Sequence, residues 1–184
     1  MSRKPDADAL HEIALNHLAR YAATQASLAR VLARRVDRWA RLAAEAEAAD
    51  PEALAAAARA MKDAIPSVIA RLREAGVLDD TVFAAARAGR LARGGKSRRL
   101  TLAHLAAKGV GMGVATEIVD GNPERELAAA CAYLRRRRAG PFGVAPEIKT
   151  LAAMARAGFP QRIALRALRM GREEAEAWIK TLHA

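Results

Sequence analysis

The residue types in this sequence that could do chemistry are mostly basic. Near the C-terminus, four arginines recur at helical spacing: Arg162, Arg166, Arg169 and Arg172. The spacing i, i+4, i+7, i+10 places the first three on one stripe of a helix and the fourth nearby. Like charges aligned in this way repel one another, and an anionic partner would relieve that repulsion. The alternative is pairing with the glutamates between positions 173 and 176. We take the first three as candidate binding residues.

A second basic group surrounds a glycine link, and it consists of Arg93, Lys96, Arg98 and Arg99. Cations beside a glycine loop can neutralise phosphates or meet an acidic protein surface. The alternative is a solvated helix end, because cations also favour a helix C-terminus. We include this link among the candidate contacts, together with Lys108, which ends the next predicted helix.

A third basic group is the run of four consecutive arginines from 135 to 138. A helix turns by about 100° per residue, so four neighbours cannot share one face. One or two of them should lie with their stems over apolar surface, leaving the others to bind. Arg135 and Arg137 are the candidates for binding.

Catalytic and metal chemistry find little support in the sequence. Asp79 and Asp80 are adjacent carboxylates, but general acid–base catalysis needs a cleft and partners converging on a substrate, and helix capping explains both residues. The four histidines are scattered singly, without cysteine or acidic neighbours at metal-ligand spacing. The glycine-rich segment 109–113 follows no strand and precedes no GK[ST], so it is not a P-loop. We expect no catalytic residue, no metal, no cofactor and no enzyme activity.

The composition favours an all-α protein. Ala, Leu and Arg dominate, aromatic residues make up only 4% of the chain, and strand-type alternation is hard to find. Much of the apolar content is alanine, which buries little area, so we expect thin cores in an elongated row of small helical repeats. The single cysteine, Cys131, lies on a predicted apolar helix face, where a buried small side chain is expected rather than a reactive thiol.

The charge of the chain narrows the class of partner. A formal net charge of +11 favours nucleic acid, an anionic membrane or an acidic protein. The few aromatic residues are too dispersed for a base-stacking platform. No apolar run is long enough to span a bilayer, and no apolar signal core follows residues 1–6. We therefore expect a cytoplasmic protein.

Three tandem segments share one plan, with two helices around a basic or polar turn and a short third helix. The predicted boundaries are 10–60, with an extended alanine-rich helix, 61–122, and 123–184, with an additional terminal helix. The second and third repeats match at a constant offset of 49 residues, which pairs Thr101, Leu105 and Gly109 with Thr150, Met154 and Gly158. Small repeats of this kind gain stability from their neighbours.

The corner at residues 72–84 carries a family resemblance. Gly76 can take the left-handed conformation that closes a helix, and Asp79 or Asp80 can cap the next one. The letters LREAGVLDDTVFA resemble the hallmark of the RecX family, small regulators of the RecA recombinase. The basic segment at 96–99 and the helix end at 105–110 are similar to the basic link and helix end of that family, and residues 14–32 to its opening repeat.

The resemblance implies a function that composition alone does not. RecX-type proteins are built from tandem three-helix repeats and bind the RecA filament on single-stranded DNA. They restrain its ATPase, strand-exchange and coprotease functions in recombination, DNA repair and the SOS response. The expected partners are therefore RecA and single-stranded DNA, with double-stranded DNA as a further candidate, and the expected state is a monomer that is not bound to a membrane.

The competing hypothesis is a helical DNA-binding protein that acts without RecA. A helix–turn–helix corner over residues 105–119 could place a short helix in a major groove. The predicted short helix over residues 114–120 contains Glu117 and Asp120 but no Arg or Lys. It would make a poor recognition helix, so we rank this hypothesis second.

Overall fold

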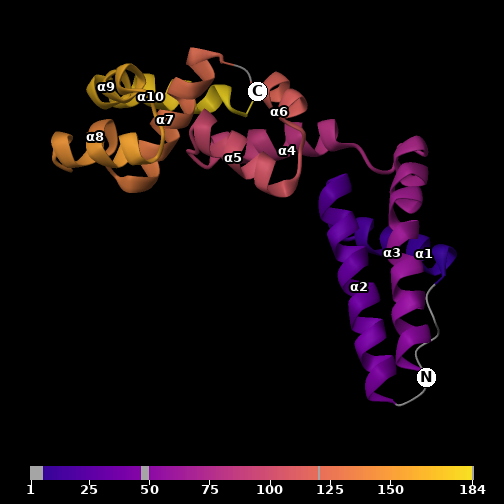
Figure 1. Ribbon diagram of the computed structural model, residues 1–184. Helices are drawn as coiled ribbons and strands as arrows, with labels where there is room; N and C mark the ends of the chain where they lie inside the picture. Colours follow the sequence, from indigo (N-terminus) through magenta and orange to yellow (C-terminus); the bar gives the residue numbers. More distant parts are fainter. Residues whose placement is uncertain (1–5, 47–49, 120, 184) are drawn as a thin grey trace. The chain divides into compact units, whose positions relative to one another are not determined.

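A computed structural model describes residues 6–46, 50–119 and 121–183 of the chain (Figure 1). All regular secondary structure in these ranges is helical, which confirms the predicted all-α class. None of the described helices is long and apolar enough to cross a membrane. Residues 1–5, used in the expectation about a signal segment, and Asp120 of the predicted recognition helix lie outside the described residues. The chain divides into two compact units, residues 1–83 and 84–184, which are described separately.

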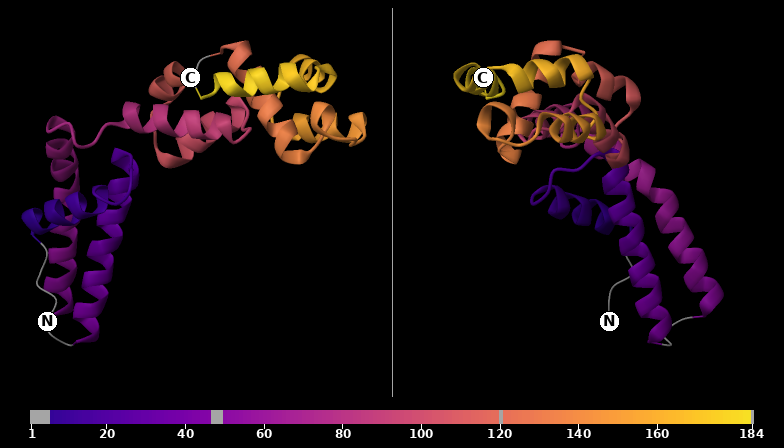
Figure 2. Two further views of the ribbon diagram at one scale, coloured as in Figure 1. Left: turned by 180° about the vertical axis from the view of Figure 1, so that it is seen from behind. Right: turned by 90° about the vertical axis from the view of Figure 1, so that its left-hand side faces the viewer.

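The first unit contains helices α1 (Ala7–Leu18), α2 (Gln25–Glu45) and α3 (Pro51–Glu74). Helices α2 and α3 lie side by side, and α1 packs against both (Figures 1 and 2). The sequence predicts caps at Thr24 and Asp50 and a first helical residue at Pro51, and the structure confirms all three. Thr24 and Ser27 form a capping box at the start of α2. Asp50 accepts a hydrogen bond from the backbone nitrogen of Ala53 at 3.0 Å, and Pro51 is the first residue of α3.

The core of the first unit draws on all three helices. The sequence predicts that Leu15, Leu18 and Tyr21 mark the first helix. Leu18 does pack against the core from the end of α1, together with the fully buried Leu10 and Ala14. Leu15 and Tyr21 differ from the prediction, because Leu15 is 40% exposed and Tyr21, which follows the helix, is 61% exposed. The spacing i, i+4 of the two buried residues directs them to the side that faces α2 and α3.

Residues 61–78 also contribute to the core of the first unit, through Met61, Ile65, Val68, Ile69, Leu72 and Leu78. These residues begin the predicted second repeat. The repeats are defined by a pattern in the sequence, whereas the compact units are defined by which residues lie close together in space. The two divisions need not coincide, so the three-repeat boundaries stay a prediction.

The corner at residues 72–84 closes α3 and opens α4 (Asp80–Arg93). Gly76 has φ of 69°, and the backbone nitrogen of Val77 donates to the Leu72 oxygen at 3.0 Å, the pattern of a glycine helix cap. The Asp79 carboxylate accepts from the nitrogens of Thr81 and Val82, so it caps α4 as predicted. The Asp80 carboxylate instead accepts from the first amide of α2, at Gln25, at 2.8 Å. Both aspartates are therefore structural.

The second unit continues α4 and adds six further α-helices with one short 3-10 turn at Gly140–Phe142. The helices are α5 (Arg98–Lys108), α6 (Met112–Ile118), α7 (Pro123–Arg137), α8 (Glu147–Arg156), α9 (Gln161–Arg169) and α10 (Arg172–Thr181). Helix α7 is the central element, and it packs against both α9 and α10. Residues 127–132 of α7 are all buried. Four of these six residues are alanines, whose small side chains allow neighbours to approach from several sides.

The pairs of residues at the 49-residue offset occupy similar environments. Thr101 and Thr150 are buried, Leu105 and Met154 are fully buried, and Gly109 and Gly158 close α5 and α8 with φ of 85° and 86°. The sequence predicts Ile148, Leu151 and Met154 as the apolar residues of α8, but Ile148 is 84% exposed, so this position is wrong. It stands six residues before Met154, which is about 120° away around a helix.

Candidate anion-binding groove

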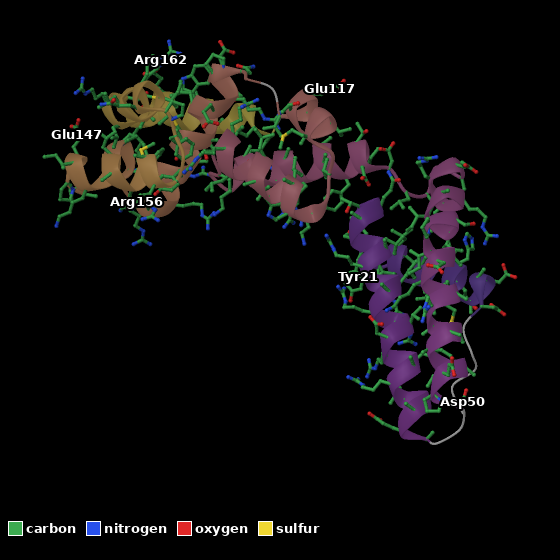
Figure 3. The ribbon with its side chains drawn as sticks, in the orientation of Figure 1. Tyr21, Asp50, Glu117, Glu147, Arg156 and Arg162 are labelled. Carbon is green, nitrogen blue, oxygen red and sulfur yellow. The ribbon has the colours of Figure 1, made fainter. Side chains whose placement is uncertain are left out.

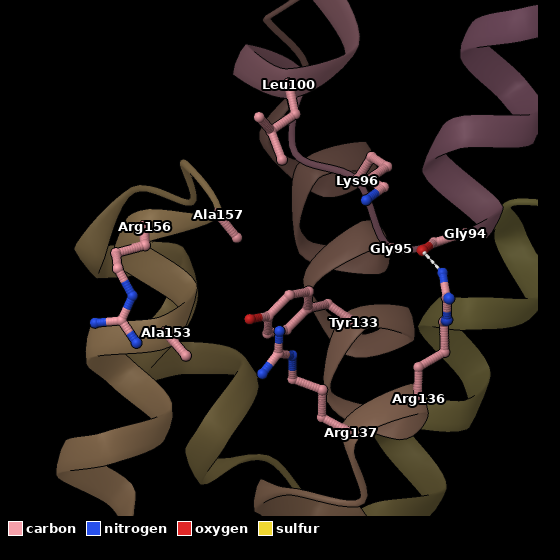
Figure 4. Close-up of a pocket in the computed structure, with 10 residues that line it drawn as sticks. All are labelled: Gly94, Gly95, Lys96, Leu100, Tyr133, Arg136, Arg137, Ala153, Arg156 and Ala157. Carbon is pink, nitrogen blue, oxygen red and sulfur yellow. Dashed lines mark hydrogen bonds between the residues drawn. The ribbon is translucent and has the colours of Figure 1, made fainter. Parts of the chain in front are cut away.

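The second unit carries a groove of about 600 Å³ between the link that joins α4 to α5, the end of α7, and α8 (Figure 4). Its lining residues are Gly94, Gly95, Lys96, Leu100, Tyr133, Arg136, Arg137, Ala153, Arg156 and Ala157. Four of them are cations, and no acidic residue is among them. We call this feature the basic groove, and define its cations as Lys96, Arg136, Arg137 and Arg156.

The link at the edge of the basic groove lies directly on α7. Gly95 has φ of 70°, and a Cβ atom there would stand 2.6 Å from the backbone nitrogen of Tyr133. Only a glycine allows the two backbones to approach so closely. A guanidinium nitrogen of Arg136 donates to the Gly94 oxygen at 2.6 Å, drawn as the dashed line in Figure 4. These contacts fix the position of Lys96, the next residue along the link.

The link is also tied to the end of α8. The Ser97 hydroxyl donates to the Ala157 oxygen at 2.6 Å, and Ser97 is fully buried. Arg99 donates to the Arg156 oxygen at 3.0 Å. Its guanidinium lies over Gly158, where a Cβ atom would stand 2.4 Å from the Arg99 Nε. Arg99, predicted as a contact residue, therefore holds the wall of the groove in place.

The other cations predicted around the link lie apart from the groove lining. The Arg98 side chain donates to the Val119 oxygen at 3.0 Å, and its backbone nitrogen donates to Glu126 at 2.8 Å. Burial raises the pKa of Glu126, although the hydrogen bond from Arg98 opposes this. Arg93 donates weakly to the Leu182 oxygen at 3.4 Å. Lys108 is exposed in the last turn of α5. Of this predicted group, only Lys96 lines the groove.

The four consecutive arginines at the end of α7 point in different directions. Arg135 pairs with Glu176 at 3.1 Å, and Arg136 holds the link. The guanidinium of Arg137 lies over the Tyr133 ring, 4.9 Å from its centre. Arg138 takes a left-handed conformation, with φ of 51°, and ends the helix. Of the predicted pair, Arg137 lines the groove and Arg135 does not.

The arginines of α9 lie on a different surface of the second unit. Arg162 is exposed on α9, whereas Arg156 belongs to α8 (Figure 3). Arg166 lies over the Trp178 ring, 5.5 Å from its centre. Arg169 pairs with Glu147 at 3.7 Å, and both side chains are more than half exposed, so this pair contributes little stability. The cationic side chains of α9 therefore stay close to solvent.

Among the polar side chains that line the basic groove, the sequence analysis missed three, which are Tyr133, Arg136 and Arg156. No local signal identifies Arg156, because it is a single arginine at the end of an ordinary amphipathic helix. Hydrogen bonds from Ser97 and Arg99 to the carbonyls at the end of α8 tie this helix end to the link, and Arg156 lies beside them. Among the described residues, no group of three or more acidic, histidine or cysteine side chains could hold a metal ion.

Comparison with known proteins identifies proteins that are similar in sequence to this chain. It is 36% identical over 170 residues to the regulatory protein RecX of Myxococcus xanthus, in an alignment that covers 88% of this chain and 85% of that protein. It is also 36% identical over 120 residues to the regulatory protein RecX of Thermobifida fusca, covering 62% of this chain and 63% of that one. No protein-family model matches the chain, and no solved structure does so. Because the first alignment spans most of both proteins, the chain belongs to the RecX family of regulatory proteins.

Proposed function

We propose that this protein regulates the RecA recombinase, and that it binds the RecA filament on single-stranded DNA and restrains its ATPase and strand exchange. The observation that carries the proposal is the relationship to the Myxococcus xanthus regulatory protein RecX, which extends over 88% of the chain. The hallmark at residues 72–84 lies at the corner between α3 and α4, where its glycine and aspartates have structural roles.

The charge distribution of the second unit supports binding to a polyanionic assembly. A RecA filament contains the phosphates of its DNA strand, and cations that neutralise phosphates release counterions and so favour binding. Arg162, Arg166 and Arg169 lie on one exposed stripe of α9. The basic groove adds four cations without an acidic residue in its lining. We propose these two surfaces as the contacts with the filament.

The proposal is tested by titrating the DNA-dependent ATPase of RecA with this protein at fixed salt. We expect inhibition at near-stoichiometric amounts. The triple substitution Arg162→Ala/Arg166→Ala/Arg169→Ala should weaken inhibition about tenfold, because it removes three cations from one stripe.

The matched control is Arg34→Ala/Arg35→Ala/Arg38→Ala on α2, which removes the same charge from exposed positions of the first unit. It should retain most of the inhibition. An equal loss in both triple variants would assign the effect to net charge alone. Absence of both inhibition and filament binding would disprove the function.

A DNA-binding function without RecA has weaker support. Helix α6 (Met112–Ile118) has seven residues and contains neither Arg nor Lys, so it offers no cation to a major groove. Sequence-selective binding to duplex DNA in the absence of RecA would favour this alternative.

A further inference from the structure

We propose that a second pocket of the second unit, separate from the basic groove, binds the carboxyl terminus of a partner polypeptide whose last side chain is apolar. The pocket has a volume of about 430 Å³ and lies between α4, the first turn of α7 and the end of α10. We call it the Trp178 pocket, and its lining includes Gly89, Arg93, Glu124, Arg125, Trp178 and Leu182. The two surfaces proposed for the filament contain none of these residues, so the site goes beyond the proposed function.

The charges of the Trp178 pocket match a single carboxylate. Among the described residues that line it, Arg93 and Arg125 are cations and Glu124 is an anion, whereas the basic groove is lined by cations without an acidic residue. The side chains of Arg125 and Glu124 form no ion pair with another described residue. A guanidinium can bind a carboxylate through two parallel hydrogen bonds. Glu124 repels the additional charge of a phosphate chain and can accept a hydrogen bond from the last peptide N–H of the ligand.

One wall of the Trp178 pocket is apolar and comes from the end of α10. Trp178 and Leu182 have the spacing i, i+4, which places them on one side of the helix, and both pack against the core of the second unit. The guanidinium of Arg166 lies over the Trp178 ring, 5.5 Å from its centre. An apolar side chain can lie against this wall while the carboxylate of the same residue meets the arginines, which is how protein sites capture a chain terminus.

Gly89 keeps space open in the Trp178 pocket. It stands in the interior of α4, where glycine is less favourable than alanine because it loses more backbone freedom on folding. Its φ is not positive, so the backbone does not require glycine. Outside the backbone of its own helix, an added Cβ atom would meet only the Arg93 guanidinium, 3.2 Å from one terminal nitrogen. The absence of a side chain therefore leaves room for this guanidinium and for a ligand beside it.

The test follows the indole N–H signals of the ¹⁵N-labelled full-length protein by NMR, without RecA or DNA. The sequence contains two tryptophans, so Trp39 of the first unit is an internal control for Trp178. The probe is the peptide SGSGAF with a free carboxyl terminus. Its addition to millimolar concentration should shift the signal of Trp178 and leave that of Trp39 in place. The variant Trp39→Phe identifies which signal belongs to which residue.

Two changes in the probe separate the carboxylate from the side chain. The C-terminal amide of the same peptide lacks the negative charge, and the peptide SGSGAS lacks the apolar side chain. Each should bind about tenfold more weakly, because a charged hydrogen bond or the burial of one aromatic side chain contributes at least this factor. Equal binding of the amide or of the serine peptide would overturn the proposal.

Two variants of the protein test the pocket itself. Arg125→Gln removes a cation, and Gly89→Ala places a Cβ atom where the Arg93 guanidinium lies. Each should weaken binding of SGSGAF by about fivefold or more. Gly89→Ala should also unfold at a higher urea concentration, because alanine favours the helix. Weaker binding in a more stable protein is not explained by unfolding.

The matched control is Arg90→Gln, which removes the same charge from an exposed position of α4 outside the pocket lining. Binding should weaken by less than about twofold, since the charge faces solvent. An equal effect of Arg90→Gln and Arg125→Gln would overturn the proposal. The same conclusion would follow from an unshifted Trp178 signal, or from an equal shift on addition of an oligothymidine strand, which would assign the pocket to phosphate.

Discussion

Cys131 is a titratable residue on the buried side of α7, and its surroundings change its pKa. The side chain is fully buried, and its Sγ lies 3.8 Å from the Sδ of Met170. Burial, together with a smaller effect of the Glu174 charge, raises the pKa of the thiol to about 11, and Arg166 opposes the shift. The thiol is therefore neutral at physiological pH, and Cys131 packs as the small apolar residue that the sequence predicts.

The raised pKa of Cys131 makes stability depend on pH. The neutral thiol stabilises the fold fully below about pH 9, and this contribution is lost as pH rises toward 11, because only the unfolded chain ionises readily in that window. Relative to Cys131→Ala, the protein should lose about 1 to 2 kcal/mol of unfolding free energy across it. Urea unfolding of both proteins at pH 8, 9 and 10 measures the difference.

An independent measurement uses the reactivity of the same thiol. Ellman's reagent should label the folded protein slowly at pH 8 and the urea-unfolded protein quickly, since the thiolate is the reacting form. Equal labelling rates in the two states would contradict the buried, neutral thiol.

The roles of individual arginines show how far sequence reasoning reaches at this scale. The basic groups around 93–99 and 135–138 are evident in the sequence, and so is the impossibility of one shared face for the latter. The sequence does not show which backbone carbonyl oxygens the fold places beside each arginine side chain. The Arg98 side chain meets the oxygen of Val119, and Arg99 meets that of Arg156. Those donors are used within the protein and do not line the groove.

Helix ends were more predictable than helix faces. The caps at Thr24, Asp50 and Gly76 depend on a few neighbouring residues, and the structure confirms them. The buried face of α1 and the exposure of Ile148 depend on which helix packs against them and at what crossing angle. Alanine-rich helices make this harder, because small side chains mark a buried face only weakly.

The contact between the α4–α5 link and α7 is tested by substitution at Gly95. Gly95→Ala should destabilise the protein by about 2 to 4 kcal/mol, which combines left-handed strain with a Cβ atom 2.6 Å from the Tyr133 nitrogen. Gly76→Ala is the matched control, since it has φ of 69° but nothing within 4 Å of the added atom. It should cost about 1 kcal/mol. Urea unfolding followed by circular dichroism measures both.

Equal costs for the two substitutions would mean that the link does not lie on α7 as closely as the structure shows. A further check is oligothymidine binding. Gly95→Ala should weaken binding more than Gly76→Ala does, because displacement of the link moves Lys96.

At the scale of the whole molecule, each compact unit has its own core. One core gathers Leu10, Leu28, Leu32 and residues of α3, and the other gathers Leu127, Leu134, Met154 and Ile179. The all-α class follows from composition and periodicity and is confirmed. The packing of residues 61–78 with the first unit could not be predicted, because the apolar face of α3 indicates that a partner exists but does not identify it.

The separate core of the second unit predicts that residues 79–184 fold on their own. This fragment retains Asp79, the cap of α4. It should give a helical circular dichroism spectrum, unfold cooperatively in urea and bind oligothymidine within about threefold of the full chain. Met154→Ala in the fragment should lower its stability by about 2 to 4 kcal/mol, since Met154 is fully buried. A fragment without a cooperative transition would contradict this prediction.

The divergent directions of the four arginines at the end of α7 have a genetic consequence. The four adjacent codons encode residues with four different roles. Arg135 forms an ion pair with α10, and Arg136 binds the link. Arg137 is exposed in the groove, and Arg138 ends the helix in a left-handed conformation. Neighbouring missense alleles should therefore have separable phenotypes. Loss of Arg137 should reduce ligand binding in a stable protein, whereas loss of Arg136 should loosen the groove itself. A short segment that looks redundant in the sequence is thus suited to separation-of-function mutagenesis.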